Sequence, residues 1–196
     1  MRSFTRIAAL TAVAGSAALV AAACGSSGSG SSSGASSSAS SSSSSAVPQL
    51  SLSQINNSFS AMATLKPLAA KGKGTVAVIL PDTVSSTRYV EFDAPYLKES
   101  FQKAGLSSSQ YVVQNALGSD ATQFSDAQTD ISKGATVLVV DALDSGVGAH
   151  IESYAKAHGV AVIDYDRLVL GGSRKYYVSF NNVQVGKLIG QGLVSC

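Results

Sequence analysis

Five short runs of β-branched and other apolar residues constrain the fold of this chain more than any other feature. The runs cover residues 75–80 (TVAVIL), 111–116 (YVVQNA), 136–142 (TVLVVDA), 160–165 (VAVIDY) and 176–180 (YYVSF). They are short, and they lack the strict alternation of polar and apolar residues that marks a half-buried strand. Continuous apolar runs of this kind are typical of strands buried on both faces of a parallel sheet.

Segments with helical periodicity separate these runs. In the first, Val90, Ala94, Leu97 and Phe101 recur at spacings of four and three, and Gly105 supplies a C-terminal stop. The same kind of pattern predicts further helices at residues 119–134, at residues 146–159 and from about residue 182 onward. The alternation predicts an α/β fold, with an open, mainly parallel sheet flanked by helices.

Polar side chains lie at or just after the ends of all five runs. They occur at residues 82–88, 115, 141–144, 164–167 and 181–182. In an open parallel sheet the carboxyl ends of the strands share one edge, and ligands bind in the crevice there. We therefore expect a polar site at this edge. The alternative is that each group belongs only to a solvated turn.

The N-terminal segment has the layout of an export signal. Arg2 and Arg6 precede an apolar run, and small residues lead to Cys24. The run is short and weakly apolar for the alternative, a transmembrane anchor. The stretch before Cys24 resembles a bacterial lipobox, which implies that Cys24 is lipidated and holds the protein to the outer face of the cell membrane.

The rest of the chain divides by composition. Residues 25–46 contain only Ser, Gly and Ala, which predicts a disordered, flexible tether. Residues 47–72 form a lead-in in which the uncharged stretch 52–65 could make a short helix. The α/β lobe is expected at residues 73–196.

Several classes of function find no support in the sequence. The chain has 14 Lys and Arg against 12 Asp and Glu, and Arg2 and Arg6 account for the excess, so no nucleic-acid partner is indicated. There is no GxGxxG, no GxxxxGK[ST] and no GxSxG motif. His150 and His158 both fall on the third predicted helix, away from the polar edge. We therefore predict a protein that is not an enzyme and uses no cofactor or metal.

The polar edge offers Asp, Asn, Arg and Tyr, a set suited to neutral polyhydroxylated ligands. Carboxylates accept hydrogen bonds from hydroxyl groups, Arg donates them, and Asn does both. An aromatic face would cover the apolar side of a sugar ring. Because the chain has no Trp, Tyr89 or Tyr165 would supply that face.

Residues 159–193, GVAVIDYDRLVLGGSRKYYVSFNNVQVGKLIGQGL, carry a specific resemblance. The YDRL motif, followed by YYVSF and then by Asn and Val-Gly, resembles the type I periplasmic binding proteins of sugar ABC importers, most of all D-xylose-binding proteins. The resemblance extends from about residue 73 and includes PDTVSSTRYVEFD after the first run. Tyr89 stands where the family often has Trp, and Asn181 replaces an Asp.

The resemblance implies a set of sugar-binding residues. Carried over position by position, together with the polar residue that ends the third run, these are Arg88, Tyr89, Asp141, Asp166, Arg167 and Asn182. The implied function is the substrate-binding component of a carbohydrate ABC transporter, with a monosaccharide ligand and a membrane permease as partners. The alternative is a lipoprotein domain that senses sugar for a membrane receptor or kinase. The family has two lobes, so we also expect that this chain is truncated before the second.

Overall fold

A computed structural model describes residues 47–196. The predicted signal sequence, Cys24 and the tether at residues 25–46 lie outside these described residues. Among residues 47–196, no helix combines the length and the apolar character needed to cross a membrane.

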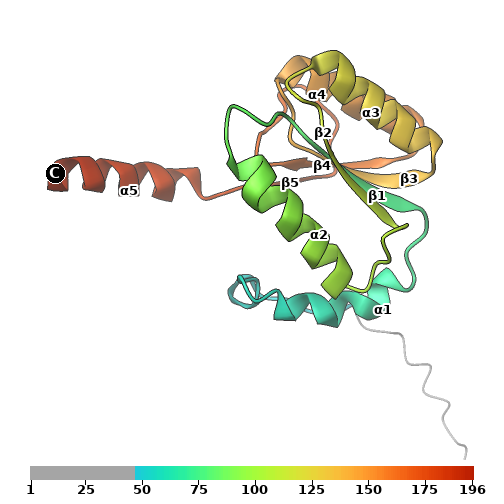
Figure 1. Ribbon diagram of the computed structural model, residues 1–196, viewed down its shortest axis with the longest axis horizontal. Coiled ribbons are helices and arrows are strands. Elements are labelled where there is room, and N and C mark those ends of the chain that lie inside the picture. The colour runs from blue at the N-terminus through green and yellow to red at the C-terminus, as the bar shows by residue number, and fades with distance from the viewer. Residues whose placement is uncertain (1–46) are drawn as a thin grey trace, which may run out of the picture. The chain divides into compact units, whose positions relative to one another are not determined.

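A parallel sheet forms the centre of the described part of the chain (Figure 1). Its strands lie in the order β2-β1-β3-β4-β5, and every neighbouring pair is parallel. Their bounds are Thr75–Leu80 for β1, Tyr111–Asn115 for β2, Ala135–Val140 for β3, Ala161–Tyr165 for β4 and Tyr176–Val178 for β5. The five apolar runs are therefore strands, with ends within two residues of those predicted.

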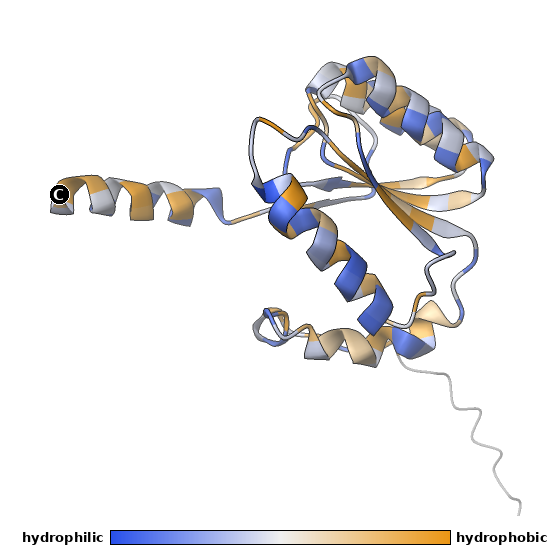
Figure 2. Cartoon of the chain, in the orientation of Figure 1, coloured by the Kyte–Doolittle hydropathy of each residue, from blue (hydrophilic) through white to orange (hydrophobic). Residues whose placement is uncertain are grey.

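Helices cover both faces of the sheet (Figure 1). One face packs against α3 and α4, and the other packs against α2. The helices are α1 (Lys66–Ala69), α2 (Ala94–Lys103), α3 (Asp120–Ser132), α4 (Ser145–Ala157) and α5 (Asn182–Ser195). Figure 2 shows the hydrophobic strands between these layers. The α/β prediction, a parallel sheet flanked by helices, is confirmed.

The start of the first predicted helix differs from expectation. Residues Tyr89–Asp93 form a π-helical turn ahead of α2. A π turn has wider spacing than an α turn, so it rotates the preceding residues out of the register of α2. Val90, predicted to face the core, is 52% exposed, whereas Tyr89 and Asp93 are buried.

The last helix also differs from expectation in its surroundings. None of its residues is buried, and its apolar side chains Val183, Leu188, Ile189 and Leu193 are exposed. In Figure 1 it extends away from the sheet. The periodicity of the sequence predicted this helix. It did not predict that the apolar stripe of the helix would be exposed.

The lead-in packs against α2. It contains 3-10 helices at Leu52–Gln54 and Ser60–Leu65, followed by α1. The rings of Phe59 and Tyr96 lie 5.5 Å apart, and Lys103 donates a hydrogen bond of 2.9 Å to the carbonyl oxygen of Ser58. This segment is thus part of the packed structure.

Candidate functional site

The polar strand ends fall into two groups with different roles. One group caps local structure. Asp82 accepts hydrogen bonds from the backbone of Val84 and Ser85, and hydrogen bonding by Ser85 lowers its pKa. Asp144 accepts from two amides at the start of α4, and Asn181 accepts from one at the start of α5. For Asp144 and Asn181, which are exposed, the solvated-turn alternative describes what the structure shows, whereas Asp82 caps its turn as a buried carboxylate.

The other group forms one connected network at the carboxyl edge. Arg88, in the segment after β1, is its centre. Its Nε lies 2.7 Å from Oδ2 of Asp93, and its two terminal nitrogens lie 2.9 and 3.2 Å from the carboxylate oxygens of Asp166. Burial lowers the pKa of Arg88, but the hydrogen bonds with Asp166 and Asp93 outweigh it, and the pKa is raised overall. Arg88 is therefore a fixed cation.

Arg167 enters the same network from the segment after β4. Its Nη2 donates a hydrogen bond of 2.9 Å to the Tyr89 hydroxyl, and its Nε lies 3.4 Å from Oδ1 of Asp141. Its Nη1 also donates to the carbonyl oxygens of Ala142 and Leu143. Arg88 and Arg167, which are 79 positions apart in the chain, thus meet at Asp141.

The backbone of Asp166 explains how the stretch YDRL reaches this network. Asp166 has a φ of 65°, in the left-handed region that Asp tolerates better than most residues. Its amide donates to the carbonyl of Val178, and its own carbonyl accepts from the hydroxyl of Ser179. The turn is therefore tied to the end of β5, and its carboxylate is directed at Arg88.

Asp141 lies behind the two arginines. Its side chain is fully buried, and its carboxylate accepts no hydrogen bond from the described residues. Burial raises the pKa of Asp141 to about 7, although Arg167 and Arg88 lower it. With Asp141 protonated, the two arginines balance the charges of Asp93 and Asp166.

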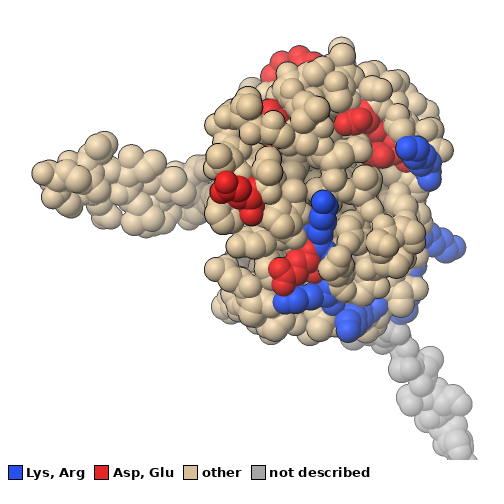
Figure 3. All heavy atoms as spheres, viewed as in Figure 1, with Lys and Arg blue, Asp and Glu red and all other residues tan. Residues whose placement is uncertain are grey.

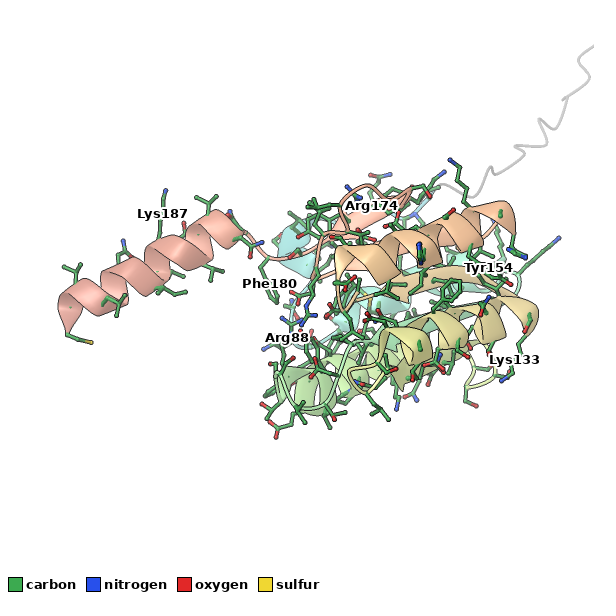
Figure 4. The ribbon with its side chains drawn as sticks, turned by 90° about the horizontal axis from the view of Figure 1, so that it is seen from above. Arg88, Lys133, Tyr154, Arg174, Phe180 and Lys187 are labelled. Carbon is green, nitrogen blue, oxygen red and sulfur yellow. The ribbon has the colours of Figure 1, made fainter. Side chains whose placement is uncertain are left out.

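Aromatic rings flank the arginines. The guanidinium of Arg88 lies 5.1 Å from the ring centre of Tyr89 and 5.3 Å from that of Phe180, and Figure 4 shows Arg88 and Phe180 beside each other. The Tyr165 hydroxyl donates a hydrogen bond of 2.8 Å to Asp93. Burial raises the pKa of Tyr165, and this hydrogen bond raises it further. The side chains of Arg88 and Arg167 remain 28% and 36% exposed, so a ligand can reach them.

Two hollows lie next to the network. One, of about 140 Å³, is lined by Tyr165, Asp166, Val178, Ser179 and Phe180. The other is larger, about 490 Å³, but Tyr89 is its only residue from the network, and most of its lining comes from α2, β1 and β2. The smaller hollow is the better candidate for a ligand group because Asp166 of the charged network and the rings of Tyr165 and Phe180 line it.

The sequence identified most of this network but not all of it. Arg88, Tyr89, Asp141, Asp166 and Arg167 come together as expected. Asn182 does not join them: no hydrogen bond or ion pair between described residues connects its side chain with the network. Asp93 and Phe180 were missed. Asp93 lies within the helical stretch after Arg88, where a single carboxylate gives no signal of facing inward.

No cluster of three or more His, Cys, Asp or Glu side chains suited to a metal occurs among residues 47–196. On the face shown in Figure 3, basic and acidic residues are interspersed.

Comparison with known proteins decides the family. Residues 76–196 match the periplasmic binding protein domain. The chain belongs to this family. Over 129 residues it is 35% identical to the multiple sugar-binding periplasmic protein SbpA of Azospirillum brasilense, covering 65% of this chain and 35% of the relative. It is 36% identical over 93 residues to a D-xylose-binding periplasmic protein of Haemophilus influenzae, covering 47% and 28%.

Solved structures agree with this assignment. A carbohydrate transporter solute-binding protein from Chloroflexus aurantiacus, in complex with D-glucose, is 32% identical with a TM-score of 0.54, covering 61% of this chain and 34% of that protein. A Caulobacter myo-inositol binding protein is 25% identical with a TM-score of 0.51. These relatives are named as binding proteins, which confirms the prediction that the chain is not an enzyme. The chain spans about 35% of the length of the first curated relative.

Proposed function

We propose that the network of Arg88, Asp166 and Arg167 binds a monosaccharide at the carboxyl edge of the sheet. The observation that carries this proposal is the convergence of these charged groups, from two separate strand ends, beside the rings of Tyr89 and Phe180. Arg donates and carboxylate accepts hydrogen bonds with sugar hydroxyls, while an aromatic face covers the apolar side of the ring.

The sugar is proposed to be xylose-like. Support comes from the relative named as a D-xylose-binding protein and from the YDRL motif, whose Asp and Arg both enter the network. Asn182 is retained as a proposed ligand group from the resemblance alone.

The wider role follows from the same relatives. We propose that the protein is exported, anchored through Cys24 to the outer face of the membrane, and delivers sugar to an ABC permease. The names of the relatives support a periplasmic carrier of sugars. Sensing for a receptor or kinase is the alternative.

The test is a titration of the full chain with xylose, ribose, glucose and galactose, followed by NMR so that weak binding is measured. A hydrogen bond to a charged group contributes about 1.5–3 kcal/mol, so Arg167→Ala should weaken binding roughly 10- to 150-fold. Lys187→Ala, on exposed α5, is the control and should bind as the wild type does.

A melting curve of each variant separates the two roles of Arg167. If Arg167 only stabilises the turn through Asp141, Arg167→Ala lowers the melting temperature and leaves affinity for every sugar unchanged. That result would reject the sugar-binding role of this residue.

A further inference from the structure

Two buried carboxylates face each other on the side of the sheet opposite to α2, apart from the Arg88 network. Glu152 comes from α4 and Asp164 from β4, and their side chains are 1% and 0% exposed. Three of their four oxygens have no hydrogen-bonding partner among the described groups. Two adjacent carboxylates in a dry environment do not both ionise, because each charge disfavours the other.

The loop that follows Arg167 covers this pair. Oδ2 of Asp164 accepts a hydrogen bond of 2.9 Å from the amide of Val169 and lies 3.4 Å from Nε of Arg174. Arg174 in turn donates a hydrogen bond of 2.8 Å to the carbonyl oxygen of Val169. Both backbone groups of Val169 are thus held by the Asp164–Arg174 ion pair. Figure 4 shows Arg174 well separated from Arg88.

Glu152 forms the floor beneath the same loop. A Cβ added at Gly172 would collide with its carboxylate, so the loop backbone lies directly on it. The hydroxyl of Ser173 points at the carbonyl of Glu152, 3.4 Å away. Gly172 and Ser173 of the loop are therefore both in contact with Glu152.

Counting charges assigns the proton. The charged groups that face Glu152 are Asp164 from β4 and Arg174 from the loop, one cation for two carboxylates. Burial raises the pKa of Asp164 as well, but the Val169 amide and the Arg174 guanidinium favour its ionised form. Burial raises the pKa of Glu152, and the charge of Asp164 raises it further, while the Arg174 amide and guanidinium lower it.

We propose that Glu152 is protonated at neutral pH and donates a hydrogen bond to Asp164, acting as a positioning residue for the loop from Arg167 to Arg174. Loss of this proton at higher pH places a second negative charge beneath the loop and loosens it. An effect on sugar affinity through Arg167 rests on the proposed function, but the stability of the loop does not.

The test compares the full wild-type chain with Glu152→Gln by urea unfolding between pH 4.5 and pH 8. Glutamine can still donate to Asp164 but does not titrate. Because the folded wild type keeps a proton that the unfolded chain releases above the ordinary pKa of 4.5, its stability falls as pH rises. The unfolding constant of the wild type, divided by that of Glu152→Gln, should increase up to about tenfold per pH unit within this window.

A control and a spectroscopic measurement complete the test. Ser173→Ala removes a loop contact without a titratable group, so its pH profile should run parallel to that of the wild type. Infrared difference spectra at pH 7, wild type minus Glu152→Gln, should show the carbonyl stretch of a protonated carboxylic acid. Asp130 and Asp141, whose pKa values burial also raises, to about 6 and about 7, are present in both proteins and cancel.

Parallel pH profiles of the wild type and Glu152→Gln, or the absence of the carboxylic acid band, would overturn the proposal. If Glu152→Gln does not fold, the infrared spectrum of Asp141→Asn across pH, from which the other buried acid with a pKa of about 7 has been removed, still decides whether a buried acid titrates above pH 7. Neither result depends on sugar binding. A negative result in these pH experiments therefore leaves the proposed sugar-binding function intact, and a negative result in the sugar titration leaves the inference about Glu152 intact.

Discussion

Asp141 shows how a single buried carboxyl organises the candidate site. Its Oδ1 lies 3.4 Å from Nε of Arg167, its Oδ2 lies 3.9 Å from Nη2 of Arg88, and its side chain is fully buried. An ionised carboxylate at this position would be stabilised by the arginines and destabilised by loss of water. The pKa of about 7 indicates that the second effect is the larger one.

We therefore expect the substitution Asp141→Asn to change the pH dependence of the free energy of unfolding. The pKa of Asp141 is raised from 3.8 to about 7 on folding, so the folded protein binds a proton that the unfolded chain loses between these values. The free energy of unfolding of the wild type should fall, relative to Asp141→Asn, by up to about 1.4 kcal/mol per pH unit as pH rises from about 4 to about 7.

Urea unfolding at a series of pH values measures this slope. Tyr89→Phe is the matched control because it removes a hydrogen-bonding group from Arg167 but no carboxyl, so its profile should parallel that of the wild type. A wild-type slope equal to that of Asp141→Asn would show that the arginines keep Asp141 ionised.

A polar side chain at the end of a predicted strand was the most useful signal in the sequence, and it was enough to identify Asp141. Arg88, Asp166 and Arg167 follow strands and also match a family motif, and all three meet in the structure. Asn182 also had both signals, but it is the first residue of the exposed helix α5 and does not join the network. Asp93 had neither signal, because its inward position depends on the π-helical turn, and Phe180 was assigned to a strand that ends at Val178.

Among the elements, α4 is placed by a contact that only glycine allows. A Cβ added at Gly148 would lie 2.5 Å from Cγ2 of Val169 and 3.0 Å from Cβ of Ala142. Val169 is 1% exposed and belongs to the core cluster on this face of the sheet. The helix thus approaches the loop closely enough for Val169 to fill the notch at Gly148.

Gly148→Ala should destabilise the protein despite the better helix propensity of alanine. Alanine gains about 0.5–1 kcal/mol in a helix interior, but overpacking a core costs about 1–3 kcal/mol. Gly148→Ala combined with Val169→Ala should cost less than the sum of the two single changes, since they share the same space. Urea unfolding of the single and double variants measures the coupling.

A helical glycine in open space provides the control for this cycle. A Cβ at Gly186 in α5 meets nothing within 4 Å, so Gly186→Ala should not destabilise the fold. Additive effects of Gly148→Ala and Val169→Ala would contradict the notch packing.

Strands were easier to predict than the surroundings of helices. The first four runs are strands whose side chains fill both faces of the sheet, and that requirement is visible in the sequence itself. The fifth run also forms a strand, but β5 lies at the edge of the sheet and its residues are exposed, so the expectation of burial on both faces is wrong there. Whether α5 is exposed depends on whether another surface packs against it. The packing of the lead-in depends on its contacts with α2, which is distant in the sequence. Neither requirement leaves a local pattern.

At the scale of the whole molecule, the candidate site and the proposed membrane anchor lie in different parts of the chain. The match to the periplasmic binding protein domain covers residues 76–196, and the described residues explain the candidate site within them. Export and anchoring rest on residues 1–46, for which the sequence is the only guide. The lipid anchor and the transmembrane anchor make different predictions for one cysteine.

Cys24→Ala should release the protein from the membrane if the lipid anchor is correct. Two acyl chains hold a protein stably because each buried CH₂ contributes about 0.8 kcal/mol, whereas a single chain gives only reversible binding. Labelling with a palmitate analogue and fractionation of the cells should show the wild type labelled and membrane-bound, and Cys24→Ala unlabelled.

Cys196→Ala is the matched control, since Cys196 is the only other cysteine, and it should behave as the wild type does. A transmembrane anchor would instead keep unlabelled Cys24→Ala in the membrane fraction, because its apolar run would remain intact, and equal labelling of both proteins would reject lipidation at Cys24.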